Sequence, residues 1–495
     1  MIPWLLALLG ALVSVLAFPP FGPGWLIVLG IGLYLAAIRV AASPRQGLLL
    51  SVVYWLGFFG GLLWWLAKLE LLAFILAPVQ ALYFVVFGWW LTRQNHRAPI
   101  PWVTLAVGGW ALTELVRHRF PVGGFEWGAA GYALSDSIFT RLPASVVGTS
   151  GLTILVVLLA AVLASGLASK FDYRLMWSMP IVFFVLLVTG VVLLLTGPTG
   201  EKLATVAIVQ GSTPCPFEHC PPDERLRTYR QHLELTKTLA EGSADLVVWS
   251  EGSTGSLTAD PVQNPEIGEA IADEARRIGA WFLVGGDRPI SETHWVNANV
   301  VFNPDGEIVG EYRKQHPVPF GEYIPWRPLF EWIPALDQVP RDMIPGDGPV
   351  VFDLGTYRLG SVISFEGGFS RYALQHRRAG ADLIVVATNE ASYGLTPASD
   401  QFIGMTRMRA VELGVPLVHA AVTGKSTIAD SFGEIGETTG LGTEEILIET
   451  IGPSWPTPYS VTGDLMTYLA VLAGLFAWWR ARELVGSADQ ITEEE

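Results

Sequence analysis

Residues 359–369 read LGSVISFEGGF, an apolar strand pattern that ends directly on Ser364. The same arrangement occurs twice more, since Glu251 follows the apolar run LVVWS and Asn389 follows LIVVAT. In open α/β sheets, functional side chains gather at the carboxyl ends of strands. The three segments therefore predict a layered α/β domain in which Ser364, Glu251 and Asn389 lie at one edge.

The composition indicates a membrane protein with a large domain in water. Of the 495 residues, 51% are hydrophobic and 16% are charged, and the mean hydropathy is +0.41. The 19 tryptophans fit a chain with membrane interfaces, which tryptophan favours. The net charge of −15 argues against nucleic acid as a partner, because nucleic-acid-binding surfaces are basic.

Apolar segments long enough to cross a bilayer occur at both ends of the chain. We expect eight transmembrane helices, at residues 3–18, 24–40, 47–67, 71–91, 102–115, 144–167, 176–195 and 465–484. The first lacks the basic flank of a signal peptide, so we expect it to be retained. The basic loops predict the cytoplasmic side, and the middle region then lies outside; these residues are Arg39, Arg45, Arg93, Arg97, Lys170, Arg174, Arg480 and Arg482.

One exterior loop departs from this charge pattern. The stretch VRHRFPVGGFEWG, residues 116–128, carries Arg117, His118 and Arg119. A basic, aromatic loop of this kind suits a lipid phosphate, and a solvated helix end is the alternative. The interiors of the predicted spans contain almost no charge, unlike those of transporters, so we expect an anchor or a lipid-facing platform.

Strand and helix patterns alternate through residues 203–452. The predicted strands are residues 204–210, 245–250, 281–285, 360–364, 382–388 and 416–421, and the predicted helices are residues 223–239, 265–278, 369–379 and 400–413. Turn signals at residues 303–306 and 353–355 predict hairpins. We therefore expect a seven-helix transmembrane domain (1–200), a layered α/β domain (201–455), and a transmembrane helix with a cytoplasmic tail (456–495).

The chain has two cysteines, Cys215 and Cys220, close together in STPCPFEHCPP. If this segment lies outside the cytoplasm, a disulfide that closes a small loop is expected. Two free thiols are the alternative. A metal site with His219 is not expected, because too few ligands lie nearby.

Seven motifs together resemble the apolipoprotein N-acyltransferase family of the carbon–nitrogen hydrolase (nitrilase) superfamily. They are YRKQHPVPFGEYIP, VVWSEGST, ISFEGGF, ATNEASYG and TRMRAVELGVPLV in the middle region, and FPPFGPGW and GGFEWGAAGY near the N-terminus. The resemblance covers nearly the full length. It implies a multi-pass helical domain in the bacterial inner membrane and an αββα sandwich on the extracytoplasmic side, with no cofactor and no metal.

The family resemblance implies a ping-pong acyl transfer. A phospholipid donates an acyl chain to the enzyme nucleophile, and the chain then passes to the α-amine of a diacylglyceryl-cysteine on an apolipoprotein acceptor. By resemblance, Glu251 is the general base, Lys314 the cation near the oxyanion and Ser364 the nucleophile position. Glu322 and Glu366 match supporting positions. These residue types suit acyl transfer, because a carboxylate takes a proton and an ammonium stabilises a tetrahedral oxyanion.

Ser364 departs from the cysteine of the family, and a hydroxyl is a weaker nucleophile than a thiol. Three explanations stay open: a cysteine replaced by design, a natural homologue without acyltransferase activity, and a slow reaction through an oxyester. Ser392 and Thr423 stand where the family pattern has tryptophan and asparagine, which suggests a divergent branch. The competing functions are a non-catalytic membrane scaffold that binds lipoproteins and a membrane-tethered amidase.

Residues 324–336, IPWRPLFEWIPAL, are aromatic and apolar in a domain that we expect to face water. Trp326, Phe330 and Trp332 are candidates for contact with the lipid headgroup zone, where acyl chains enter the site. Packing against the rest of the domain is the alternative. Asn389 likewise has two interpretations, as a site residue or as a turn residue.

Overall fold

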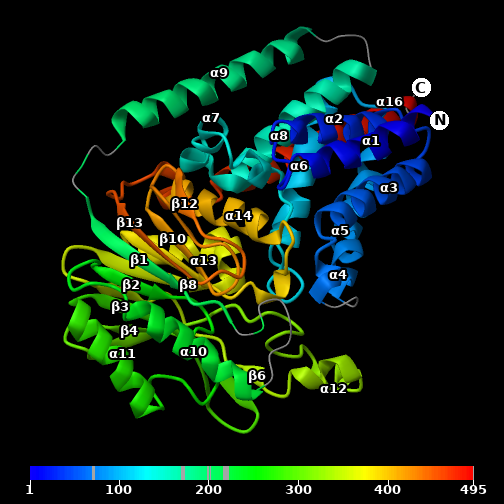
Figure 1. The fold of residues 1–495 in the computed structure, drawn as a ribbon. Helices are drawn as coiled ribbons and strands as arrows, with labels where there is room; N and C mark the ends of the chain where they lie inside the picture. The colour runs from blue at the N-terminus through cyan, green and yellow to red at the C-terminus, as the bar shows by residue number, and fades with distance from the viewer. Residues whose placement is uncertain are drawn as a thin grey trace. The chain divides into compact units, whose positions relative to one another are not determined.

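The computed structural model describes residues 1–69, 73–168, 173–197, 200, 202–213, 215 and 222–493. The chain divides into two compact units, one formed by Met1–Thr196 with Thr462–Glu495 and the other by Gly197–Val461 (Figure 1). We describe each unit by itself.

The first unit is helical. Its main helices are α1 (Ile2–Leu16), α2 (Leu26–Arg39), α3 (Pro44–Leu62), α5 (Leu76–Thr92), α6 (Pro99–Arg117), α8 (Ala144–Ala168), α9 (Tyr173–Thr196) and α16 (Leu465–Glu493), with the short α4 (Leu66–Leu69) and α7 (Ile138–Arg141) between them. A helix therefore lies at each predicted span. Prolines and caps explain several starts: Ser43 accepts a hydrogen bond from Gln46 N–H, and Pro44 occupies the first turn of α3.

Two helical stretches are long and apolar enough to cross a membrane among the described residues, Ala73–Thr92 and Ala144–Leu167. Three shorter apolar helices accompany them, Ile2–Leu16, Leu26–Arg39 and Leu465–Arg480. Close helix packing uses small residues, because a Cβ on Gly108 of α6 would lie 2.5 Å from the Cα of Gly474 in α16. The eight predicted crossings are thus confirmed as helices, while their passage through a bilayer stays a prediction.

The basic loop contains one buried arginine, Arg117, and one exposed arginine, Arg119. Arg117 is fully buried and donates hydrogen bonds to Glu114, to the carbonyls of Phe125 and Trp127, and to Gln80. Of the two interpretations of this loop, the solvated helix end is therefore wrong for Arg117, whose donors satisfy the backbone of its own loop. Glu114 also puts a buried charge near the end of α6, where we expected almost none.

The second unit contains two β-sheets. One has the strand order β13-β1-β2-β3-β4-β5, with β6 beside β4, and the other has the order β12-β11-β10-β9-β8-β7. The strands of the first sheet are β1 (Ala204–Gln210), β2 (Leu246–Trp249), β3 (Trp281–Pro289), β4 (His294–Phe302), β5 (Ile308–Arg313), β6 (Asp342–Met343) and β13 (Glu445–Ile451). Those of the second are β7 (Val351–Asp353), β8 (Arg358–Ile363), β9 (Leu383–Thr388), β10 (Leu417–Ala421), β11 (Thr427–Ala429) and β12 (Ile435–Thr438).

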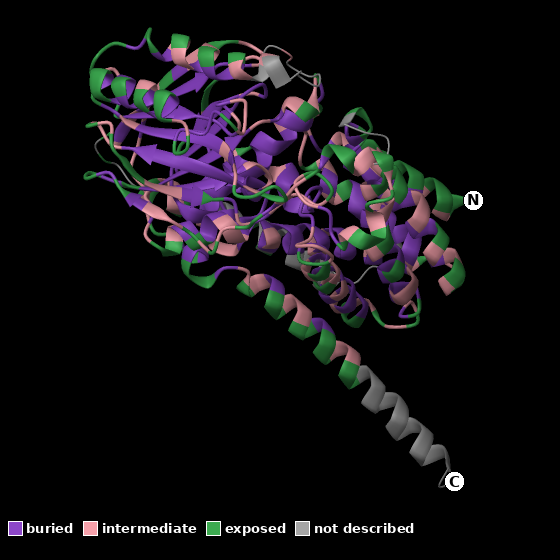
Figure 2. Cartoon of the chain, turned by 90° about the horizontal axis from the view of Figure 1, so that it is seen from below, coloured by how far each residue is buried: buried purple, intermediate pink, exposed green. Residues whose placement is uncertain are grey.

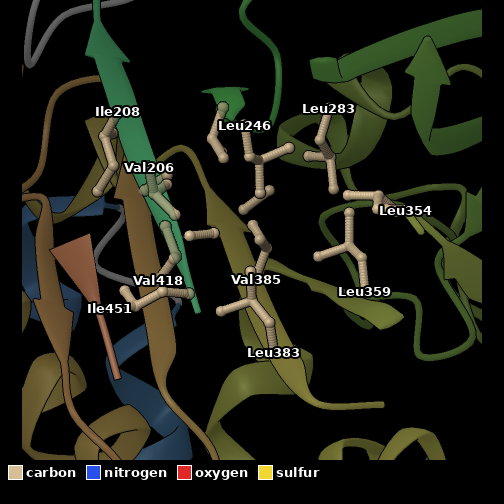
Figure 3. Close-up of a cluster of buried hydrophobic side chains, with 14 of the residues drawn as sticks. Val206, Ile208, Leu246, Leu283, Leu354, Leu359, Leu383, Val385, Val418 and Ile451 are labelled. Atoms are coloured by element: carbon tan, nitrogen blue, oxygen red, sulfur yellow. The ribbon is translucent and has the colours of Figure 1, made fainter. Parts of the chain in front are cut away.

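Strands in which polar and apolar residues do not alternate are buried on both faces here. This is expected for the inner layers of a sandwich. Val206 and Ile208 of β1 point to the interior between the sheets, where they join Leu383 and Val385 of β9 (Figure 3). Ala207 and Val209 of the same strand belong instead to a second cluster against the helices. Figure 2 shows many strands of this unit in the colour of buried residues, and β2, β9 and β10 are buried throughout.

Four helices cover the sheets and complete the predicted αββα sandwich. They are α10 (Pro222–Thr236) and α11 (Pro265–Ile278) beside the first sheet, and α13 (Ser370–Arg378) and α14 (Ala398–Leu413) beside the second. The hairpins predicted at residues 303–306 and 353–355 join β4 to β5 and β7 to β8. The sandwich expected from the sequence is confirmed.

Candidate active site

Glu251 lies at the carboxyl end of β2, two residues after Trp249. Its close fit against β3 requires Gly285, because a Cβ there would lie 2.3 Å from the carbonyl oxygen of Ser250. The buried Glu251 carboxylate accepts hydrogen bonds from Asn297 Nδ2 at 2.7 Å and from the backbone N–H of Asn389 at 3.1 Å. The two sheets therefore both contribute to holding this carboxylate.

Lys314 directly follows β5 and is fully buried. Its Nζ lies 3.3 Å from Glu251 Oε1 and 2.5 Å from Glu322 Oε1. Burial alone would lower the pKa of Lys314, but the carboxylates of Glu251 and Glu322 raise it above its ordinary value. The ammonium is thus charged at neutral pH and fixed between two carboxylates.

Glu322 closes the other side of the ammonium. Its second oxygen accepts a hydrogen bond from the Val318 backbone N–H at 2.7 Å, which fixes the carboxylate within its own loop. Burial raises the pKa of Glu322 above its ordinary value, while Lys314 acts to lower it. Glu322 is therefore fixed both to the Lys314 ammonium and to the backbone of its own loop.

Ser364 directly follows β8 and is the first residue of a short 3₁₀ helix, Ser364–Gly368. Its φ of 55° is in the left-handed region, which a non-glycine residue adopts at an energetic cost. The residue is half-buried. Backbone strain at a residue between a strand and a helix is also a feature of the nucleophile elbow.

Glu366 links this turn to the lysine. One carboxylate oxygen accepts from the N–H groups of Gln315 and His316, and the other accepts from the Ile363 N–H and the Tyr312 hydroxyl, all between 2.6 and 2.9 Å. Burial raises the pKa of Glu366 to about 7, and the hydrogen bond from Ile363 is the first of the contacts that lower it. One side chain thus binds the residue before Ser364 and the residue after Lys314.

We expect Glu366→Gln to destabilise the second unit by about 2–4 kcal/mol, because a single amide oxygen replaces two carboxylate oxygens and leaves buried N–H donors unpaired. Urea denaturation followed by tryptophan fluorescence measures this loss. Glu234→Gln is the matched control, since Glu234 is exposed and pairs with Lys237 at the surface. Equal unfolding midpoints for the two variants would show that Glu366 does not brace the site.

Asn389 is both a turn residue and a contact of the site. Its N–H binds Glu251, its Oδ1 accepts from the Ala391 N–H, and its carbonyl accepts from the Thr423 hydroxyl at 3.1 Å. The next residue, Glu390, has a φ of 59° and is anchored by His419 Nε2 at 2.8 Å. The two interpretations of Asn389 therefore do not exclude each other.

The aromatic segment is partly exposed. Trp326 and Trp332 are 62% and 75% exposed. Phe330 is half-buried, and the centroid of its ring lies 5.4 Å from that of Phe320. The helix α12 (Arg327–Phe330) between the two tryptophans is tied down by the pair of Arg327 with Asp342. Packing explains Phe330 but leaves the two tryptophan rings largely uncovered.

Asn297 is the site contact that the sequence did not single out. It lies on β4, and its carbonyl accepts from the Lys314 N–H at 2.9 Å while its amide binds Glu251. The available signal was two inward-facing asparagines, 297 and 299, in an otherwise apolar strand. Among the described residues no cluster of potential metal ligands occurs. The predicted disulfide involves Cys220, which lies outside the described residues.

Comparisons with known proteins give family matches to both parts of the chain. Residues 205–455 match the carbon-nitrogen hydrolase family, and residues 10–162 match the apolipoprotein N-acyltransferase N-terminal domain. The chain is similar to the apolipoprotein N-acyltransferase of Geobacter metallireducens, with 30% identity over 90% of this chain and 88% of the relative. That of Nitrosomonas europaea is 28% identical over 95% and 96% of the two chains.

Among solved structures, an amidase from Nesterenkonia sp. matches with a TM-score of 0.38 and 16% identity, over 53% of this chain and 93% of the amidase. The relatives extend across both units, and the two family matches fall one in each. The chain therefore belongs to the apolipoprotein N-acyltransferase family, acyltransferases of lipoprotein maturation within the carbon–nitrogen hydrolase superfamily.

Proposed function

We propose that this protein transfers an acyl chain from a phospholipid to the α-amine of a diacylglyceryl-cysteine at the N-terminus of an apolipoprotein. The observation that carries the proposal is the buried Lys314 ammonium held between Glu251 and Glu322. Its neighbour along the chain is joined through Glu366 to the elbow of Ser364.

In the first half-reaction, Ser364 Oγ attacks the acyl carbonyl carbon of the phospholipid and its proton passes to Glu251. The Lys314 ammonium stabilises the oxyanion that forms on the carbonyl oxygen. The intermediate collapses to an oxyester on Ser364, and the lysophospholipid oxygen leaves with the proton from Glu251. In the second half-reaction, the lipoprotein amine attacks this ester, Glu251 accepts its proton, and Ser364 regains a proton as the amide is released.

The serine limits the first half-reaction. An alcohol is far less acidic than a thiol, and a carboxylate is a weak base for removing its proton. We therefore propose that the acyl-enzyme forms slowly in this chain. The scaffold alternative follows from the same residue, since a protein that binds lipoproteins without modifying them has no need of a thiol.

The helical unit supports a membrane location. We propose that residues 1–200 and the helix from residue 465 cross the bacterial inner membrane, and that residues 201–455 form the catalytic domain on the extracytoplasmic side. The two long apolar stretches and three shorter apolar helices support this proposal. The phospholipid donor then lies in the same bilayer as the enzyme.

We expect the double variant Trp326→Ala/Trp332→Ala to weaken binding of a lysophospholipid on the order of tenfold, because large aromatic side chains contribute strongly when buried at an interface. Both rings are largely exposed, so the unfolding midpoint should stay the same. Reconstituted protein and a fluorescent lysophospholipid measure the binding. Val262→Ala, an exposed apolar residue in another loop, is the control, and equal affinity in all three proteins would contradict a lipid contact.

Two incubations separate the competing functions, one with lipid substrates and one with a soluble amide alone. The purified chain is mixed with phospholipid and a synthetic diacylglyceryl-cysteine lipopeptide, and the products are identified by mass spectrometry. An N-acylated lipopeptide supports the transferase. A bound but unmodified lipopeptide supports the scaffold, and turnover of a soluble amide without lipid supports an amidase.

A further inference from the structure

Asp287 of β3 belongs to a polar row at the end of the sandwich interior. Side chains alternate along a strand, so Asp287 faces the same way as Leu283, which lies in the core between the sheets. Across the strands, Asp287 is directly opposite Asn297 on β4. Directly opposite residues on one face have Cβ atoms about 4.5–5.5 Å apart, which brings these two side chains into contact range.

The two side chains present oxygens that face no donor. Asp287 Oδ1 and Asn297 Oδ1 are both buried and have no hydrogen-bond partner among the described residues. The orientation of the Asn297 amide is determined by its Nδ2, which donates to Glu251 Oε1 at 2.7 Å. The Asn297 oxygen can therefore accept a hydrogen bond from Asp287 only if the Asp287 carboxyl group carries a proton.

The charges around Asp287 disfavour a carboxylate. Glu251 and Asp260 from the loop after β2, and Glu322 from the loop after β5, are negative, and Lys314 is the cation that opposes them. Lys314 is already paired with Glu251 and Glu322, and Arg288 is paired with Asp260 and Glu311. Burial raises the pKa of Asp287 to about 8, and Glu251 and Glu322 add to this rise.

We propose that Asp287 is a positioning residue that stays protonated at neutral pH and donates a hydrogen bond to Asn297 Oδ1. This bond holds the Asn297 amide with its NH₂ group on the Glu251 carboxylate. Ionisation of Asp287 would set two acceptor oxygens against each other and loosen the amide. The effect on catalysis rests on the proposed function, whereas the protonation of Asp287 does not.

Infrared spectroscopy tests the proton directly. At neutral pH, the difference spectrum between the protein and Asp287→Asn should contain the carbonyl band of one protonated carboxyl group, which disappears as the pH rises through about 8. Glu292→Gln, an exposed acid in the β3–β4 hairpin, should remove only a carboxylate band. A carboxylate band lost in Asp287→Asn at neutral pH would overturn the proposal.

A second comparison tests the hydrogen bond, in the Ser364→Cys background where acylation is measured by intact mass. Asp287→Leu removes the donor at similar size, and we expect acylation to slow about tenfold, the loss of one buried hydrogen bond. Asp287→Asn keeps a hydrogen-bond donor, so we expect a smaller loss of acylation rate. We also expect that this rate does not fall at alkaline pH. Equal losses in the two variants would overturn the positioning role. If no variant acylates, the proposed function fails, while the infrared titration still decides the state of Asp287.

Discussion

Ser364→Cys is expected to raise the rate of acyl transfer to a diacylglyceryl lipopeptide on the order of 10²-fold. The buried Glu251 carboxylate is a poor base for an alcohol but is adequate for a thiol, whose ordinary pKa of about 8.5 is much lower. The elbow at Ser364 is retained, because cysteine differs from serine by one atom. Initial rates of N-acylation with vesicle phospholipid, followed by mass spectrometry, measure the change.

The matched control is Ser392→Cys, which puts a thiol in the exposed loop after β9 but not in the elbow. This variant should leave the rate unchanged. A similar rise in both variants would mean that any nearby thiol reacts and that position 364 has no special role.

Lys314→Met should abolish most of the activity gained in Ser364→Cys and should also destabilise the second unit. Removal of one oxyanion donor costs about 10²–10³-fold in rate in other acyl-transfer enzymes. Loss of one partner from a buried ion pair typically costs about 3–5 kcal/mol, because the remaining charge is left unpaired. Here the Glu251 and Glu322 carboxylates both lose their cation.

The destabilisation should depend on pH in a defined direction. Lowering the pH protonates the carboxylates that Lys314→Met leaves unpaired, so the difference in unfolding free energy from the parent should shrink as the solution becomes acidic. Urea denaturation at several pH values measures this. Lys237→Met, at an exposed pair with Glu234, is the control and should cost less than about 1 kcal/mol. A Lys314→Met protein as stable as this control would contradict the buried cluster.

The elements predicted best are those with local signals. Helix α11 begins and ends at the predicted residues, because Asn264 caps it, Pro265 occupies its first turn and Gly279 ends it in the left-handed region. Strand β1 was likewise predicted residue for residue. Strand β13 was missed because its place beside β1 depends on pairing across most of the second unit, which no local pattern specifies.

The site residues divide in the same way, into those with a local sequence signal and those whose place depends on distant segments. Glu251, Lys314 and Ser364 lie in short motifs at strand ends, and the family resemblance identifies these motifs. The contribution of Asn297 depends on the register of β3, β4 and β5, and that of Glu366 on four contacts from separate segments. The burial of Arg117 was not predicted for a similar reason. The backbone carbonyls that accept its hydrogen bonds belong to the loop that folds back on it.

Intact mass spectrometry of Ser364→Cys, after incubation with phospholipid vesicles, tests the central claim most directly. The account predicts a mass increase equal to one acyl chain, which prior alkylation of the introduced thiol blocks and which addition of a diacylglyceryl lipopeptide reverses. An unchanged mass, in a protein whose introduced thiol still reacts with an alkylating agent, would contradict the acyl-enzyme route.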